Sequence, residues 1–280
     1  MGVSQKEQYL KDGAVLIKNA LTPDELAKCE ACFNWAIENP SPLGHWTFVG
    51  TPQQSYVDNG NVAAAPMYAE LVKALPFGEI LSELWGSEHV WYFAEEVFAK
   101  EGGGAPRTPW HQDTSYLPWA GNHWANAWIS FEAVPKKNAL EVVRGSHHGV
   151  LHDGTTFKDP FDPTEPLHQS ASMPRLPDIE KIRKTDPDAF DILSWSTEPG
   201  DILFLHPGSL HGGAQVDADF PNRRTLVLRF FGDDATFRPM PSDSKARGTS
   251  KNPEGTVYAE FVKHLRAGDP FRAPIFPQLK

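Results

Sequence analysis

The chain has 280 residues, of which 40% are hydrophobic and 22% are charged, and its formal net charge at pH 7 is −10. This composition is ordinary for a folded globular protein and excludes a chain dominated by disorder. The acidic balance, without a basic face or stripe, argues against a nucleic-acid-binding protein, because such proteins set cationic side chains against phosphates.

The sequence also argues against a membrane protein. No stretch approaches the roughly 20 apolar residues that a membrane-spanning helix needs. The opening residues, MGVSQKEQYL, contain no hydrophobic signal core. We therefore expect a cytoplasmic protein that acts on a small molecule, without a nucleic-acid or membrane partner; the oligomeric state is unknown from the sequence.

The first predicted elements are a strand and a helix. Residues Ala14–Lys18 are apolar and β-branched enough to form a strand. A helix then begins with Thr22 as N-cap, Pro23 in its first turn and Glu25 completing a capping box. Hydrophobic residues recur along this segment at helical spacing, which predicts one buried face.

Two further helices are expected at Met67–Leu75 and Phe77–Trp85, separated by Pro76, which cannot continue a helix. The earlier helix, the one capped by Thr22, contains the two cysteines, Cys29 and Cys32, in a C-x-x-C pattern. No second cysteine pair completes a zinc site, so we favour packing over redox or metal chemistry for these thiols.

After these helices the sequence changes to short β-rich segments separated by turns. The expected strands are Val90–Ala99, Asn126–Val134, Leu140–Val143, Ile202–Leu205 and Thr225–Phe231. Residues 152–196 are rich in proline and aspartate and too long for a simple connection. We interpret this segment as an insertion that caps a site, with one short helix at Asp178–Lys184, and we expect a closing helix at Thr256–Leu265.

Helices followed by many short strands predict a mainly β fold with flanking helices, most simply a double-sheet jelly roll. We expect a single domain over 1–280. Its parts are helical support mostly at 20–86, a jelly-roll core at about 88–235 with the insertion at about 152–196, and a C-terminal helix and tail at 236–280.

A metal site is the strongest functional signal. His111 and Asp113 are two residues apart, so on an extended segment both side chains point to one face while Gln112 points away. His211, flanked by glycines after a predicted buried strand, is the candidate third ligand. Two histidines and one carboxylate leave open positions on the metal, which suits an Fe(II) oxygenase better than zinc.

His206 remains an alternative ligand, since it lies only five residues before His211. The other histidines have no partner at a telling distance along the chain, and we expect surface or supporting roles for them.

An anion site is predicted just after the metal site. In the strand that opens with Arg223, alternation places Arg223, Thr225 and Arg229 on one face and Arg224 on the other. A buried guanidinium needs an anionic partner, and its fork matches a carboxylate. That partner is either the distal carboxylate of 2-oxoglutarate or an acidic side chain of the chain itself.

Together these motifs resemble the phytanoyl-CoA dioxygenase (PhyH) family of Fe(II)/2-oxoglutarate-dependent oxygenases. The resembling segments occur in the family's order and are HQD at 111–113, NAWISF at 126–131, LEVVRGSH at 140–147, PGD at 199–201, HG at 211–212 and RRTL at 223–226. They span roughly residues 90–231, and the amino-terminal strand and helix are similar to the family's opening as well.

The resemblance implies a double-stranded β-helix, that is, a cupin-like jelly roll supported by N-terminal helices. It implies Fe(II) on His111, Asp113 and His211, and the distal carboxylate of the cosubstrate 2-oxoglutarate on Arg223. The implied activity is hydroxylation of an unactivated C–H bond of a small metabolite with O2, releasing succinate and CO2, with ascorbate in a supporting role.

Two further residues stand at positions that border the cosubstrate in relatives, Asn126 and Trp128. For Trp128 a packing role in the core is an equal alternative. Asp113 matters in another way, because halogenating relatives replace this carboxylate with a small residue; its presence favours hydroxylation or another oxidation.

Three other functions stay open on this fold: a cupin-like metal-dependent isomerase, a dioxygenase independent of 2-oxoglutarate, and a non-catalytic binding module. The substrate is not readable from the sequence. Arg229 could anchor an anionic substrate or form a structural ion pair. The expected lid segments are Pro118–Trp124 and the insertion, and the candidate pocket aromatics are Tyr92, Phe93, Trp110, Tyr116, Trp119 and Trp124.

Overall fold

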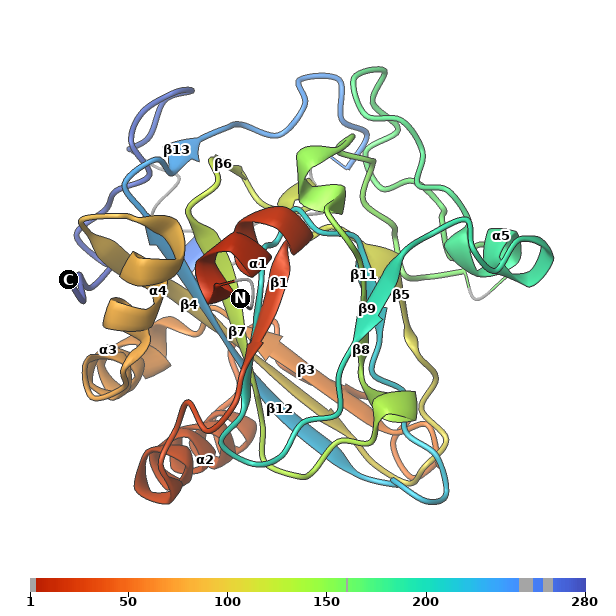
Figure 1. The fold of residues 1–280 in the computed structure, drawn as a ribbon, viewed down its shortest axis with the longest axis horizontal. Helices are drawn as coiled ribbons and strands as arrows, with labels where there is room; N and C mark the ends of the chain where they lie inside the picture. The colour runs from red at the N-terminus through yellow and green to blue at the C-terminus, as the bar shows by residue number, and fades with distance from the viewer. Residues whose placement is uncertain (1–3, 160, 247–253, 259–263) are drawn as a thin grey trace.

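The computed structural model describes residues 4–159, 161–246, 254–258 and 264–280 (Figure 1). Its α-helices are α1 (Gln5–Asp12), α2 (Pro23–Glu38), α3 (Ala65–Lys73), α4 (Phe77–Trp85) and α5 (Ile179–Thr185). Its strands are β1 (Ala14–Ile17), β2 (His45–Thr47), β3 (Ser55–Asn59), β4 (Val90–Lys100), β5 (Thr108–His111), β6 (Trp119–Ala120), β7 (Trp124–Ser130), β8 (Leu140–Val143), β9 (Ile192–Ser194), β10 (Ile202–Leu205), β11 (His211–Gly213), β12 (Arg223–Gly232) and β13 (Thr236–Phe237).

Two antiparallel sheets face each other and enclose the interior of a jelly roll (Figure 1). The larger sheet has the strand order β1-β10-β7-β12-β4-β3-β2, and the smaller sheet has the order β5-β11-β8-β9. Apart from the consecutive pairs β2–β3, β3–β4 and β8–β9, the paired strands of these two sheets are far apart in the sequence. The mainly β architecture with flanking helices is therefore confirmed.

The central strand of the larger sheet, β12, has one face toward the helices and one toward the interior. Leu226, Leu228 and Phe230 belong to the core shared with the helices, whereas Arg223 and Thr225 line the interior cavity. This alternation follows from the strand's two-residue period. It gives the interior polar side chains without exposing the opposite apolar face.

Helices α2, α3 and α4 cover the outer face of the larger sheet (Figure 1). Phe77, the first residue of α4, meets Phe204 of β10 and Phe230 of β12 edge-on, at centroid distances of 5.5 and 5.6 Å. All three rings are fully buried. Edge-to-face aromatic contacts add to the hydrophobic gain from such burial, so this trio fastens the helical layer to the sheet.

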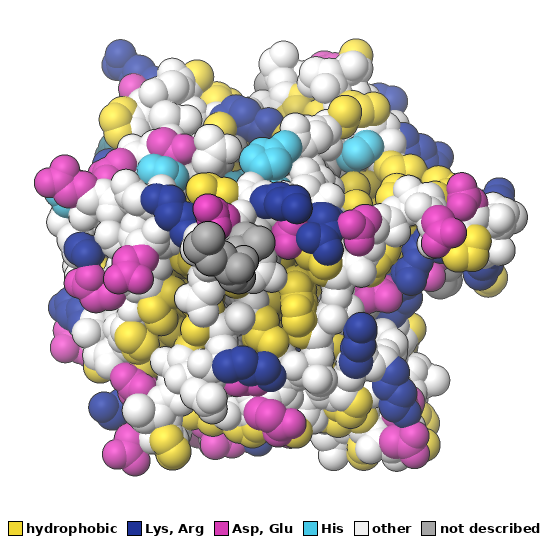
Figure 2. Space-filling model, viewed as in Figure 1, with side chains coloured by type: hydrophobic (Ala, Val, Ile, Leu, Met, Phe, Trp, Pro, Cys, Tyr) yellow, Lys and Arg dark blue, Asp and Glu magenta, His cyan; other side chains and the backbone are white. Residues whose placement is uncertain are grey.

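Apolar side chains from the two sheets pack against each other where their strands do not pair. A small cluster joins Ala14 of β1 and Leu203 of β10 to Leu140 and Val142 of β8. On the face shown in Figure 2, hydrophobic side chains gather toward the middle while charged side chains lie mostly around them. The two sheets thus meet through packing rather than through strand pairing at this edge.

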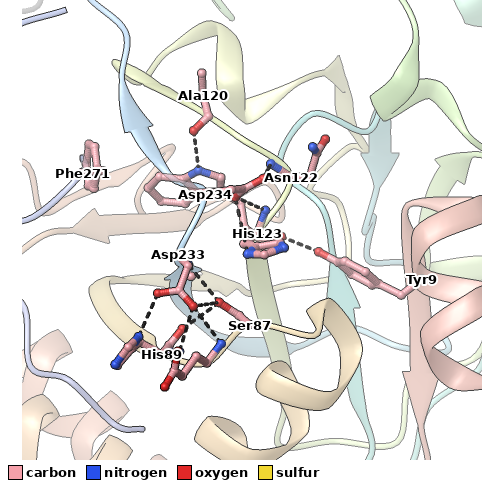
Figure 3. Close-up of polar contacts among 12 residues, drawn as sticks. Tyr9, Ser87, His89, Ala120, Asn122, His123, Asp233, Asp234 and Phe271 are labelled. Carbon is pink, nitrogen blue, oxygen red and sulfur yellow. Dashed lines mark hydrogen bonds and ion pairs between the residues drawn. The ribbon is translucent and has the colours of Figure 1, made fainter. Parts of the chain in front are cut away.

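One end of the larger sheet is tied together by two aspartates that follow β12 (Figure 3). Asp233 Oδ2 accepts hydrogen bonds from the backbone N–H groups of Glu88 and His89, at 2.7 and 3.0 Å. Asp234 accepts from those of Asn122 and His123, both at 2.7 Å. These bonds fix the turns that lead into β4 and β7, on either side of β12.

The predicted elements are largely confirmed: helix α4 and strands β8 and β10 have the expected bounds, and the others shift by a few residues. The insertion differs, because its end forms β9 and pairs with β8 in the smaller sheet. The expected lid at Pro118–Trp124 is wrong, since Trp119 and Trp124 are buried and β6 pairs with β13.

Several elements were not expected, namely α1 and the β2–β3 hairpin. The helix predicted at Thr256–Leu265 lies partly outside the described residues, which omit 259–263. Within the described part of the chain, none of the helices combines the length and the apolar character needed to cross a membrane.

Replacing Phe77 with Ala should lower the free energy of unfolding by about 3–5 kcal/mol, because it leaves a cavity between α4 and the sheet. Urea unfolding measures this change. Phe161→Ala is the matched control, since that side chain is 95% exposed, and it should change stability by less than about 0.5 kcal/mol. Equal effects of the two substitutions would contradict the assigned role of the aromatic trio.

Candidate metal centre and cavity

Strand pairing in the smaller sheet brings the two candidate histidine ligands together. His111 at the end of β5 lies directly opposite His211 at the start of β11, and their ring centroids are 4.2 Å apart. Asp113 follows β5 in a short 3-10 turn. Their ligand atoms all lie within 4.8 Å of one another, the only such His/Cys/Asp/Glu group among the described residues.

The orientation of both imidazoles is set by backbone carbonyls. His111 Nδ1 lies 2.8 Å from the carbonyl oxygen of Pro109, and His211 Nδ1 lies 2.9 Å from that of Ser209. A carbonyl only accepts, so each Nδ1 carries a proton and each ring turns Nε2 inward, where its neutral form offers a lone pair. This backbone support of the far ring nitrogen is the arrangement found around metal-bound histidines.

The inward atoms converge on one carboxylate oxygen. Asp113 Oδ1 is 3.3 Å from His111 Nε2 and 3.7 Å from His211 Nε2. His211 Nε2 is buried and has no hydrogen-bond partner among the described residues. A buried polar atom without a partner is costly, and a cation placed between these three donors would satisfy all of them. The donor set therefore fits a metal ion.

Charge in the site favours an ionised Asp113. Burial raises the pKa of its carboxyl, but His211, His111 and Arg229 outweigh burial and hold the pKa well below its usual range. Burial and the neighbouring His111 lower the pKa of His211 to about 4. For His111 burial acts in the same direction, yet the hydrogen bond and charge of Asp113 raise its pKa above the ordinary value.

The second oxygen of Asp113, Oδ2, interacts with two side chains on the side away from the histidines. Asn126 on β7 donates from Nδ2 to Asp113 Oδ2 at 2.6 Å, and Arg229 Nη2 lies 3.9 Å from the same oxygen. Arg229 is itself paired with Glu96 on β4. Burial lowers the pKa of Arg229, but Glu96 and Asp113 raise it above its ordinary value, so the guanidinium keeps its charge.

The three residues open into a cavity of about 490 Å³ between the sheets. It is lined by Val57, Asn59, Glu96, Phe98, Lys100, Thr108, His111, Asp113, Tyr116, Leu117, Trp128, Leu140, Phe157, His211, Ala214, Arg223, Thr225, Arg229 and Tyr258. A mostly apolar cavity with a few convergent polar groups is typical of a small-molecule site.

Two cations stand at one end of this cavity. Arg223 on β12 and Lys100 on β4 are cross-strand partners, and neither forms an ion pair with a carboxylate of the described residues. Arg223 Nη1 donates to the carbonyl of Asn138 at 2.6 Å, and Lys100 Nζ donates to that of Ala214 at 2.9 Å. Burial lowers the pKa of Arg223 to about 10, and burial together with Arg223 lowers that of Lys100 to about 7. An anion would stabilise both groups.

The structure places His111, Asp113, His211 and Arg223 around one cavity. Arg224 points to the opposite face of β12, where it pairs with Glu132 and Glu30. His206 lies apart, with its Nδ1 accepting from the backbone N–H of Gly208 at 3.0 Å. Trp128 lines the cavity, where its ring stacks on Phe98.

Some expectations about side chains differ from the structure. Asn126 is not among the residues that line the cavity; it lies behind Asp113. Of the six candidate pocket aromatics only Tyr116 lines the cavity. Lys100 and Phe157 were missed, because neither carries a local motif: Lys100 is brought to the site by the β4–β12 register, and Phe157 by the path of the insertion.

Comparisons with known proteins agree with this geometry. The family model of "Phytanoyl-CoA dioxygenase (PhyH)" matches residues 9–225. A "Probable phytanoyl-CoA dioxygenase" from Caenorhabditis elegans is 24% identical over 257 residues, which cover 84% of this chain and 76% of that protein.

Solved structures of similar fold include proteins that depend on 2-oxoglutarate or were solved with it. The carbocyclase SnoK of nogalamycin biosynthesis aligns with a TM-score of 0.68 at 19% identity, over 100% of this chain and 97% of its own. The epimerase SnoN, solved with Fe3+, alpha ketoglutarate and nogalamycin RO, has a TM-score of 0.68 at 18% identity, over 99% of this chain and 97% of its own. EctD from S. alaskensis, solved with 2-oxoglutarate and 5-hydroxyectoine, has a TM-score of 0.62 at 16% identity, over 96% of this chain and 85% of its own.

Metal binding should weaken as the pH falls from about 8 to about 6, because a metal must displace the proton that His111 takes up at its raised pKa. Asp113 stays ionised throughout this window, and His211 stays neutral. Calorimetric titration with Co(II) at both pH values measures the affinity, and we expect a loss of about tenfold. An affinity independent of pH would show that no proton competes with the metal for His111.

Replacing His211 with Ala should abolish stoichiometric metal binding, because the ion loses one of three protein ligands. His206→Ala is the control, since His206 is also a buried histidine of the same segment, and it should bind metal like the unaltered protein. Metal analysis after gel filtration gives the stoichiometry. The reverse result would transfer the ligand role to His206.

Proposed function

Because the chain belongs to the phytanoyl-CoA dioxygenase family, we propose that it is an Fe(II)- and 2-oxoglutarate-dependent dioxygenase that hydroxylates a small organic molecule. One observation carries the proposal. The His-Asp-His donor set and a pair of buried cations without acidic partners line the same cavity. A metal chelated by a keto acid with a distal carboxylate would satisfy both ends at once.

In this proposal His111, Asp113 and His211 hold the iron. Three protein ligands leave positions open for a chelating cosubstrate and for oxygen, whereas a structural zinc site is closed by four. When bound, iron and 2-oxoglutarate supply the oxidation chemistry, in which O2 is consumed and succinate and CO2 are released. Asn126 acts as a positioning residue: its bond to Oδ2 leaves Oδ1 of Asp113 for the metal.

The cationic end of the cavity binds the distal carboxylate of 2-oxoglutarate. Arg223 supplies a planar fork suited to a carboxylate, and Lys100 adds a second positive charge beside it. Both cations are already oriented by backbone carbonyls, so binding requires little rearrangement. Trp128 forms part of the wall next to this end.

The protein's remaining task is to position the C–H bond and to exclude water. Residues of the insertion contribute to both, because Phe157 lies edge-on to His111 with a centroid distance of 5.3 Å. Asp113 supplies a carboxylate to the donor set, where halogenating relatives have a small residue. Its presence favours hydroxylation or another oxidation over halogenation.

The test is succinate formation from 2-oxoglutarate with Fe(II), O2 and ascorbate, scored against a panel of small compounds. Arg223→Ala should raise the KM for 2-oxoglutarate by about 10- to 100-fold, which corresponds to the loss of charged hydrogen bonds. Arg224→Ala is the matched control on the opposite face of β12, and it should change that KM by less than about twofold.

Two results would contradict the proposal. Iron binding without any succinate across the panel would favour an isomerase, a cosubstrate-independent dioxygenase or a binding module. Succinate formation that is equally strong in Arg223→Ala would place the cosubstrate carboxylate elsewhere.

A further inference from the structure

The cavity extends past the metal ligands to a second end whose chemistry differs from the cationic one. Arg223 and Arg229 are six residues apart on β12, which corresponds to roughly 20 Å along an extended strand. Away from Arg223 and Lys100, the side chains that line the cavity include Asn59, Glu96, Tyr116, Phe157 and Tyr258. Three of these five are aromatic, and one is a carboxylate.

Among the cavity-lining residues that the structure describes, the cation at this end, Arg229, is neutralised by a carboxylate. Its Nη2 pairs with Glu96, while its Nε and Nη1 are buried without a hydrogen-bond partner. Lys100 and Arg223 belong to the opposite end, beyond the metal ligands. An anionic group entering here would lie near the carboxylates of Glu96 and Asp113, so repulsion would outweigh what a neutralised guanidinium can offer.

Glu96 presents an unused acceptor to the cavity. Its Oε2 binds Arg229, while its Oε1 has no hydrogen-bond partner among the described residues and does not belong to the buried unsatisfied atoms. Glu96 lines the cavity beside its cross-strand partner Asn59, so we place Oε1 at the cavity surface. A carboxylate oxygen accepts strongly from a hydroxyl group.

Phe157 forms the aromatic wall on the side of the insertion. Its ring stacks on Tyr116 at a centroid distance of 5.7 Å and 23° and meets His111 edge-on. The loop is held at its base, since the hydroxyl of Tyr116 accepts from the N–H of Thr155 at 2.7 Å and donates to its carbonyl at 3.0 Å.

The conformation of Phe157 is unusual for a residue with a side chain. Its φ is +55°, a left-handed value that is strained for a non-glycine residue, and its side chain is 48% exposed although it is large and apolar. A strained backbone and an exposed ring at the rim of a cavity are both explained if the ring contacts a ligand.

We propose that this end of the cavity binds an uncharged ring compound that carries a hydroxyl group. Glu96 accepts the hydrogen bond of the hydroxyl, and Phe157 packs against the ring and selects for it. The inference deepens the proposed function, since it names the substrate class of the same site, and it rests on that function only for the statement that the ligand is oxidised.

The test compares two probes with the same ring, 2-naphthol and 2-naphthoate, by calorimetry. The full chain is used with Zn(II) and 2-oxoglutarate, which together do not react with oxygen and which fill the cationic end of the cavity. We expect 2-naphthol to bind at least about tenfold more tightly than 2-naphthoate. Equal affinities, tighter binding of 2-naphthoate, or no binding of either probe would overturn the proposal.

Glu96→Gln gives a sharper result, because it removes the charge that neutralises Arg229 while it keeps the shape of the side chain. The preference should reverse, with 2-naphthoate gaining at least about tenfold in affinity and 2-naphthol losing. Glu101→Gln, an exposed carboxylate just after the same strand, is the control and should leave both affinities unchanged. An unchanged preference in folded Glu96→Gln would overturn the role of Glu96.

Phe157→Ala keeps the test decisive if Glu96→Gln does not fold, which circular dichroism reveals. It should weaken 2-naphthol by about 5- to 10-fold, because the probe loses an aromatic contact together with the apolar area that this contact buries. Phe161→Ala on the same loop is the control, because its ring points to solvent and does not line the cavity. Equal effects of the two substitutions would overturn the role of Phe157.

These binding measurements test the ligand preference independently of the proposed oxygenase activity. Selective 2-naphthol binding without any succinate formation would contradict the oxygenase activity and leave the binding preference standing. Succinate formation without selective binding would do the opposite.

Discussion

The structure depends on three electron-pair donors that face one another at the interior end of the smaller sheet. His111 Nε2, His211 Nε2 and Asp113 Oδ1 converge, and the backbone carbonyls behind the two rings keep their lone pairs turned inward. Such an arrangement is unfavourable without a positive charge between the donors. It persists because β5 and β11 pair in a register that sets the two histidines opposite each other. The strand pairing of the jelly roll thus keeps the three donors close together, and a bound cation would neutralise their repulsion.

Strand β12 distributes charge along the cavity. At one end Arg223 stands beside Lys100 without an acidic partner, and at the other Arg229 is paired with Glu96 and approaches Asp113. The two arginines share one face of one strand, yet only Arg229 has an acidic partner among the described residues. The two ends of the cavity therefore differ in charge: one is suited to a carboxylate, and we propose that the other takes an uncharged molecule. The opposite face of the same strand carries the apolar residues that hold the helical layer.

The sequence predicts the features that are set within a single strand, but it does not predict those that depend on how distant strands pair. The two-residue period was enough to set His111 and Asp113 on one face and to separate Arg223 from Arg224, because it acts within one strand. Lys100 could not be found that way, since its place beside Arg223 depends on which strands pair and in which register. Trp119 and Trp124 belong to a segment predicted as a loop that overhangs the metal site. They are instead buried in a second aromatic core, whose long-range packing is not visible in the local sequence. Phe157 sits in a segment without periodicity, so only the folded path of the insertion reveals it.

The central claim is that one metal ion binds to His111, Asp113 and His211 and leaves room for a chelating keto acid. Crystals grown without oxygen in the presence of Fe(II) and 2-oxoglutarate, measured on both sides of the iron absorption edge, test it most directly. We expect one anomalous peak between the three side chains, with the cosubstrate extending from it toward Arg223 and Lys100. An iron peak elsewhere, or an ion at this position closed by a fourth protein ligand, would contradict the account.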